Sequence, residues 1–183
     1  MRTLSKLLLT IGLIMTLTDA AQAGDPENTL VMEIEHGTIV IELFPDVAPK
    51  HVARIKELTR QGFYDGVVFH RVMDGFMAQT GDPTGTGTGG SGQKIDAEFS
   101  TVPFTRGTVG MARSQSPDSG DSQFFIMLAE GSSLNGQYTV WGRVIEGMDA
   151  VDKIKKAPAG SQSGTVDDPD KVVRMRVKAD IKE

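Results

Sequence analysis

Residues 69–82 read FHRVMDGFMAQTGD. The stretch holds a histidine, an arginine, two phenylalanines, two methionines and a glutamine, but no serine or cysteine that could serve as a nucleophile. A buried strand rarely contains an arginine, and a solvated surface does not favour Phe76 and Met77. The stretch therefore predicts a place where a ligand is both desolvated and hydrogen-bonded.

The first 23 residues have the pattern of a secretory signal peptide. Arg2 and Lys6 precede an apolar run over residues 7–17, and residues 21–23 (AQA) form a small-residue cleavage site. The run is short for a membrane span, which needs about 20 apolar residues. We therefore expect cleavage after Ala23, a single domain over residues 24–183, and no stable membrane association after cleavage.

Charge and composition exclude several classes of protein. Without Arg2, Lys6 and Asp19, the 19 basic and 24 acidic residues of the whole chain become 17 and 23, a formal charge of −6. An acidic chain without a basic block is a poor candidate for binding nucleic acid. The chain has no cysteine, which excludes disulfide scaffolds, thiol catalysis and thiolate metal sites.

The hydrophobic pattern predicts a mainly β protein. Alternating strands over residues 29–34 and 38–43 flank a turn, and a helix begins near Asp46 and ends at Gly62, which can adopt a left-handed conformation. Further short strands are predicted over residues 68–72, 77–80, 108–112, 124–128, 139–144 and 172–179. A second short helix is predicted from Met148, ending in Lys155-Lys156. Many short strands and two helices in one unit favour a closed barrel over alternating strands and helices.

Three other patterns resemble functional motifs, but none has the required context. The glycines of residues 84–90 match G-x-G-x-x-G without a strand before them or a helix after them, so we expect a flexible surface loop. Residues 114–121 contain serines and carboxylates but no nucleophile elbow, which predicts a polar turn. The three histidines have no metal-ligand spacing, and we expect them in a turn (His36), on a helix surface (His51) and on an outer strand face (His70).

Strand periodicity places particular side chains together. Arg71 is two residues from Phe69 and is expected on the same face, and Met77 shares a face with Gln79, whereas Phe124 and Phe125 point to opposite faces. If Arg71, Met77, Gln79 and Phe125 converge, they form an apolar cup with a fixed cation and an amide at its rim. The alternative is a core arginine whose guanidinium reaches solvent over methionine and phenylalanine. The residues alone favour neither interpretation.

Several linked motifs are similar to the signature of the cyclophilin-type peptidyl-prolyl cis-trans isomerases. They are FHRV (69–72), GFMAQ (75–79), GD (81–82), GMA (110–112) and SQFFI (122–126), with FPDVAPK (44–50), YDG (64–66) and VWGRV (140–144) on either side. The resemblance extends from about Thr29 to the C-terminus. It implies a closed eight-stranded antiparallel β-barrel, capped by two α-helices, with the active groove on its outside.

The resemblance also implies roles for individual residues. Arg71 corresponds to the catalytic arginine, and Gln79 is assigned to the catalytic residues with it. The proline pocket and the groove that holds the substrate backbone correspond to Phe76, Met77, Ala112, Arg113, Gln123, Phe125, Leu134 and Tyr138. The reaction needs no nucleophile, metal or cofactor, because it only rotates a peptide bond. A permanently charged guanidinium can donate to the prolyl nitrogen more strongly when the bond is twisted than when it is planar.

The sequence departs from the commonest pattern of that family at four places. Arg113-Ser114 stands where many eukaryotic members have Asn-Ala, which resembles bacterial members. Ser133 stands where some members have tryptophan, which predicts weak cyclosporin binding. Tyr138 stands where many have histidine. Thr80 stands where glycine is usual, and the sequence indicates no function for this difference.

The resulting hypothesis is an exported prolyl isomerase that assists protein folding. We expect its partners to be proline-containing peptides and unfolded or folding polypeptides, its state to be monomeric, and its location to be the periplasm of a Gram-negative bacterium. The alternative is a proline-recognising binding module or holdase with little isomerase activity.

Overall fold

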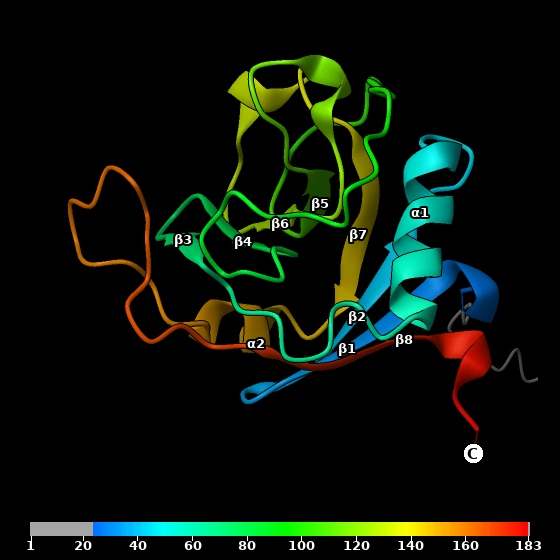
Figure 1. The fold of residues 1–183 in the computed structure, drawn as a ribbon, viewed down its shortest axis with the longest axis horizontal. Helices are drawn as coiled ribbons and strands as arrows, with labels where there is room; N and C mark the ends of the chain where they lie inside the picture. The colour runs from blue at the N-terminus through cyan, green and yellow to red at the C-terminus, as the bar shows by residue number, and fades with distance from the viewer. Residues whose placement is uncertain (1–23, 183) are drawn as a thin grey trace, which may run out of the picture.

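A computed structural model of the chain describes residues 24–182. The predicted signal peptide lies outside the described residues. Eight strands form one antiparallel sheet in the order β3-β4-β6-β5-β7-β2-β1-β8 (Figure 1). Their bounds are β1 Thr29–Ile34, β2 Gly37–Leu43, β3 Arg71–Met73, β4 Met77–Thr80, β5 Thr108–Met111, β6 Phe124–Met127, β7 Val140–Glu146 and β8 Val172–Val177. No helix in this part of the chain has the length and apolar character that crossing a membrane requires.

Two α-helices and four 3-10 turns accompany the sheet. Helix α1 (Pro49–Arg60) packs against β8, and α2 (Met148–Lys153) packs against β2. The 3-10 turns are η1 Pro26–Asn28, η2 Pro117–Ser119, η3 Ser132–Leu134 and η4 Lys178–Asp180. The predicted elements are therefore present, but β3 begins three residues later than residue 68, and β8 gives way to η4 after Val177.

The sheet curls without closing into a barrel, which corrects the predicted closed architecture. Register shifts within the β1–β8, β2–β7 and β5–β7 ladders bend the sheet. The edge strands β3 and β8 form no ladder with each other, because β3 has only three residues and the loop over residues 157–170 lies beside it. Two isolated bridges, Val68 with Lys171 and Arg71 with Thr165, connect the two sides of this seam.

Irregular hydrogen bonds satisfy the backbone along the seam. The Phe69 N–H donates to the Asp170 carbonyl, and the Val72 N–H donates to the Gly164 carbonyl. Thr80 is fully buried, and its hydroxyl donates to the Val68 carbonyl over 2.9 Å. Thr80 therefore has a structural role here, since its hydroxyl satisfies a carbonyl that lies just before β3.

The sheet carries apolar clusters on both faces. The larger core contains buried Phe69, Phe124 and Trp141 together with α1 and α2 side chains. A second cluster contains Phe125, Met77 and further side chains on the other face of β4 and β6. Phe124 and Phe125 thus point to opposite faces, as the strand periodicity predicts. Because both faces are covered, β5 and β6 are buried along their whole length.

Helix α1 begins without a local side-chain cap. It starts at Pro49, and Asp46 does not cap it. Instead, the Glu98 carboxylate accepts from the backbone N–H groups of Lys50 and His51, each over 3.0 Å. A negative charge at this end also complements the helix dipole. The helix ends at Arg60, two residues before the predicted Gly62, which is left-handed at φ +70° as expected.

Two histidines are more buried than we predicted. His51 is 1% exposed rather than on the helix surface, because its Nδ1 lies 2.7 Å from Glu98 Oε2 beneath α1. Burial lowers the pKa of His51, and its hydrogen bond to the Glu98 carboxylate opposes this shift. His70 is 6% exposed rather than on an open strand face, because the loop at Gly87 covers its ring. His36 lies in the predicted turn, with Nε2 3.0 Å from Asp170.

Candidate active site

The strand register places the candidate residues in one row across the outer face of the sheet. Arg71 on β3 pairs with Gln79 on β4, Gln79 pairs with Phe125 on β6, and Phe125 pairs with Gly110 on β5. Directly opposite residues point to the same face, so all four belong to one surface. A register slip of one residue in β4 or β6 would turn Gln79 or Phe125 into the core.

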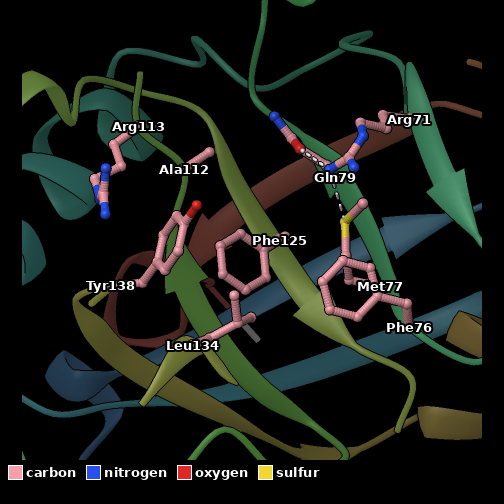
Figure 2. A pocket seen from close by; sticks show the side chains of 9 residues that line it. All are labelled: Arg71, Phe76, Met77, Gln79, Ala112, Arg113, Phe125, Leu134 and Tyr138. Atoms are coloured by element: carbon pink, nitrogen blue, oxygen red, sulfur yellow. Dashed lines mark hydrogen bonds between the residues drawn. The ribbon is translucent and has the colours of Figure 1, made fainter. Parts of the chain in front are cut away.

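A cavity of about 170 Å³ lies over this row (Figure 2). Nine of the ten predicted site residues line it: Arg71, Phe76, Met77, Gln79, Ala112, Arg113, Phe125, Leu134 and Tyr138. The tenth, Gln123, lines an adjoining cavity and reaches this one through its hydrogen bond to Gln79. The structure therefore brings the residues together, while their individual roles stay predictions.

Arg71 is held at the edge of the cavity by several acceptors. Its Nε donates to the Ser163 carbonyl over 2.9 Å, and its Nη1 donates to Gln79 Oε1 over 3.3 Å. Its Nη2 lies 3.1 Å from the Met73 sulfur. Burial lowers the pKa of Arg71, and the nearby Tyr138 opposes this shift. The guanidinium nevertheless keeps its charge at neutral pH, since an arginine does not lose its proton in proteins.

An amide relay extends from the arginine into the glycine-rich loop. Gln79 Nε2 donates to Gln123 Oε1 over 2.9 Å. Gln123 Nε2 donates in turn to the carbonyls of Gly87 and Gly89, over 3.1 and 2.8 Å. Because each amide donates to the next acceptor, the relay fixes both amide orientations and connects the position of Arg71 to that of the loop.

The floor of the cavity is aromatic and apolar. The Phe125 ring stacks on Phe104 at 5.7 Å, and the Tyr138 ring meets Phe125 edge-on at 5.8 Å. Met77 is 1% exposed and closes the side next to Phe76. Figure 2 shows Arg71 and Arg113 at opposite sides of the hollow, with Phe125 between them in this view. The cavity therefore combines a small apolar hollow with a cation at its rim.

The loop over residues 84–90 is organised around the carboxylate of Asp82, which is fully buried. The carboxylate accepts from the Thr84 N–H and hydroxyl and from the Gly87 and Gly89 N–H groups, over 2.6 to 3.0 Å. Burial acts to raise the pKa of Asp82, but these hydrogen bonds outweigh it and lower the pKa to about 2. The loop lies at the surface as predicted, and its hydrogen bonds give it a defined shape.

Some groups at the site could not be found from the motifs. Phe104 supports Phe125, and its place after Pro103 gives no strand signal. Ser163 contributes only a carbonyl from a polar loop, so no side-chain pattern identifies it. Met73 lies two positions from Arg71 on the same strand, and the shared face is a signal that could have included it.

The comparisons with known proteins agree with this geometry. Residues 29–177 match the family model described as cyclophilin type peptidyl-prolyl cis-trans isomerase. A curated relative in Brucella suis, named probable peptidyl-prolyl cis-trans isomerase, is 53% identical over 186 residues, covering 95% of this chain and 92% of the relative. The human peptidyl-prolyl cis-trans isomerase-like 1 is 39% identical over 147 residues, covering 78% and 88%.

Solved structures show the same fold. A cyclophilin from Hirschia baltica matches with a TM-score of 0.76 at 30% identity, covering 87% of this chain and 77% of that one. A cyclophilin type isomerase from Cryptosporidium parvum, crystallised in the presence of the dipeptide Ala-Pro, matches with a TM-score of 0.75 at 30% identity, covering 81% and 98%. The chain belongs to the cyclophilin-type family, and its activity is peptidyl-prolyl cis-trans isomerisation.

Proposed function

We propose that isomerisation takes place in the cavity lined by Arg71 and Phe125, with the substrate proline in the apolar hollow. Phe76, Met77, Phe125 and Leu134 bury the pyrrolidine ring and hold one side of the X–Pro bond. Groove residues Gln79, Ala112 and Gln123 hold the substrate backbone on the other side. The presence of an Ala-Pro dipeptide with the Cryptosporidium relative supports a proline-containing ligand for this chain.

Arg71 acts on the bond without forming a covalent intermediate. Rotation costs about 18–20 kcal/mol because the resonance of the amide must be broken. As the bond twists, the prolyl nitrogen loses conjugation and becomes a better hydrogen-bond acceptor. A guanidinium already oriented by Ser163 and Gln79 can donate to it with little reorganisation, so the interaction is stronger in the transition state than in the planar ground state.

The position of Arg71 is the observation that carries this proposal. A module that only bound proline would need the apolar hollow but not a cation oriented at its rim, which favours an enzyme over a holdase. Arg71→Ala should lower turnover of a short X–Pro peptide by about 10²–10³, the range for removal of one preorganised donor. Peptide affinity should change much less. A stopped-flow isomerisation assay with a separate binding titration measures both quantities.

Arg71→Lys separates charge from geometry in the same assay. Lysine keeps a positive charge but cannot reproduce the planar donor arrangement, so we expect an intermediate rate. An Arg71→Ala enzyme with unchanged turnover would overturn the assignment of Arg71. If the unmodified protein binds proline peptides but does not isomerise them, the result would instead favour the binding-module alternative.

The biological setting of this activity is also a proposal. The leader pattern of residues 1–23 supports export to the periplasm of a Gram-negative bacterium, where unfolded or folding polypeptides would be the substrates. We expect the mature protein to act as a monomer, without nucleic acid as a partner. Edman sequencing of the protein from a periplasmic fraction should begin at Gly24, and recovery of an uncleaved chain in the cytoplasm would contradict export.

Weak cyclosporin binding is proposed from Ser133, which lies exposed in η3 at the edge of the cavity. A serine offers neither the large apolar surface nor the N–H donor of the tryptophan that some family members have there. Nanomolar inhibition of the isomerase by cyclosporin would contradict this proposal.

A further inference from the structure

The arginines of the described residues fall into two groups. Six of the eight, Arg54, Arg60, Arg106, Arg143, Arg174 and Arg176, form ion pairs with carboxylates. The other two, Arg71 and Arg113, have no carboxylate within ion-pair distance over residues 24–182 and both line the site. In a chain with a formal charge of −5, both arginines without an ion pair in the described residues therefore lie at the groove.

A second cavity of about 320 Å³ adjoins the first. The two share Gln79, Ala112 and Arg113 in their walls, so a peptide with its proline in the first cavity can place a neighbouring side chain in the second. The second cavity also contains two charged groups of its own, Lys94 and Asp121. Whether the second cavity favours an acidic or a basic side chain therefore depends on whether the ligand contacts Lys94 or Asp121.

The charge of Asp121 is already satisfied by the protein. Its carboxylate accepts from the Ser91 N–H over 2.7 Å, the Ser91 hydroxyl over 2.5 Å and the Gly92 N–H over 3.1 Å. Its side chain is 7% exposed, whereas the Lys94 side chain is 65% exposed. Lys94 Nζ lies 3.5 Å from Asp121 and still faces solvent. A ligand in the second cavity thus meets the cation more readily than the anion.

Arg113 is oriented between the two cavities. Its guanidinium lies 4.5 Å from the centre of the Tyr138 ring, and its Nε donates to the Gln137 carbonyl over 3.0 Å. Its Nη1 donates to the carbonyls of Ser114 and Gln115. These neutral acceptors fix the side chain but do not neutralise its charge, and its Nη2 donates to no group within residues 24–182. An oriented arginine whose Nη2 N–H groups remain free can donate to a carboxylate.

We propose that Arg113 and Lys94 are specificity-determining residues that select proline peptides with a carboxylate side chain near the X–Pro bond. The inference rests on the proposed function of the cavity and adds a substrate class to it. Arg71 contributes to the same field, but it acts on the prolyl nitrogen, so charge selection is assigned to the other two cations. Acidic segments of a folding polypeptide would be preferred over basic ones.

Isomerisation of a peptide series tests the proposal on the full mature chain. Each peptide carries Glu, Gln or Lys at one position from three before to three after the proline, and an all-alanine peptide serves as the neutral reference. At one or more positions, kcat/KM at low salt should be about fivefold higher with Glu than with Gln, and lower with Lys. The difference should shrink in 1 M NaCl, where the Debye length is about 3 Å.

Substitutions assign the preference to the two cations. Arg113→Gln and Lys94→Gln should each reduce the Glu-to-Lys ratio, and Arg113→Glu should bring it below one, which loss of structure cannot explain. Lys153→Gln on α2 removes the same charge from an exposed position away from the groove and should leave the ratio unchanged.

Three results would overturn the inference, and they are distinguishable. Equal rates with Glu, Gln and Lys would reject charge selection by Arg113 and Lys94, and so would a preference that persists in both glutamine variants. The proposed function would stand in either case if the neutral peptide is still isomerised. Failure to isomerise any peptide would overturn the proposed function and the inference with it.

Discussion

Arg71 and Gln79 lie directly opposite each other across the β3–β4 ladder, and Arg71 Nη1 donates to Gln79 Oε1 over 3.3 Å. The glutamine amide is itself fixed by donation to Gln123 on the adjoining segment before β6. The orientation of the arginine therefore depends on neighbours that need not touch the rotating bond of the substrate.

Gln79→Leu removes that acceptor while keeping a side chain of similar size. Loss of one hydrogen bond to a charged group corresponds to about 1.5 kcal/mol, so we expect kcat to fall about tenfold with a smaller change in KM. Steady-state isomerisation kinetics measure the two parameters. Gln61→Leu, at the exposed end of α1, is the control, and equal kcat in both variants would show that Gln79 does not orient the arginine.

Met77→Asp should weaken peptide binding rather than the chemical step alone. Met77 is 1% exposed and borders the hollow, so a carboxylate there would face the proline ring in an apolar environment. We expect at least about a tenfold loss of peptide affinity in a binding titration. Met77→Leu, which keeps volume and polarity, should bind nearly normally. Circular dichroism separates this effect from unfolding, and an affinity equal to that of Met77→Leu in a folded protein would contradict the proline pocket.

Gly164→Ala tests whether the loop over residues 157–170 positions Arg71. A Cβ at Gly164 would lie 2.5 Å from Met73 Cγ and 3.2 Å from Arg71 Cγ, so those side chains must move. Gly160 is the matched control, because it is also left-handed but a Cβ there would meet no atom within 4 Å. Both alanine variants should lose about 1–2 kcal/mol of stability from the left-handed backbone. Only Gly164→Ala should also lose kcat, and equal rates in the two variants would contradict the positioning role.

Asp82→Asn should destabilise the glycine-rich loop. An amide offers one acceptor oxygen where the carboxylate offers two, so N–H groups of the loop lose a partner, at a cost of about 1–3 kcal/mol. Thermal or urea unfolding at pH 7 measures the change. Asp74→Asn, at an exposed position, should leave stability nearly unchanged.

The same pair of variants gives a pH dependence with a defined sign. The pKa of Asp82 is lowered from 3.8 to about 2 in the folded protein, so its carboxylate contributes stability that is complete above its unfolded pKa. That contribution is lost as the pH falls from about 4 towards 2. The stability difference between the unmodified protein and Asp82→Asn should therefore shrink over this window, and a difference independent of pH would contradict the lowered pKa.

Strand periodicity and linked motifs predicted most of the fold and the composition of the site. The two-residue period correctly placed Met77 with Gln79 and separated Phe124 from Phe125. It wrongly placed Arg71 with Phe69, which is buried in the larger core, because β3 begins only at Arg71 and the strand period does not extend back to Phe69. The register across strands was not predictable from the sequence, and the row from Arg71 to Gly110 depends on it. Long-range pairing is decided by packing of the whole sheet rather than by local composition.

Contacts between distant segments account for the errors. His51 was expected at the helix surface because helical periodicity does not show that Glu98 lies over that end of α1. The closed barrel was expected because a count of strands does not reveal that β3 has only three residues and that a loop lies beside it. Ser163 was missed because a backbone carbonyl carries no signature in the residue type.

The seam between β3 and the residues before β8 joins segments of the chain that the ribosome synthesises at different times. Arg71 obtains its Ser163 acceptor from a segment 92 residues later in the sequence. A nascent chain that has not yet reached Ser163 therefore lacks this acceptor for its arginine. We therefore expect Arg71 to reach its final orientation only once the loop over residues 157–170 has been synthesised and has packed beside β3.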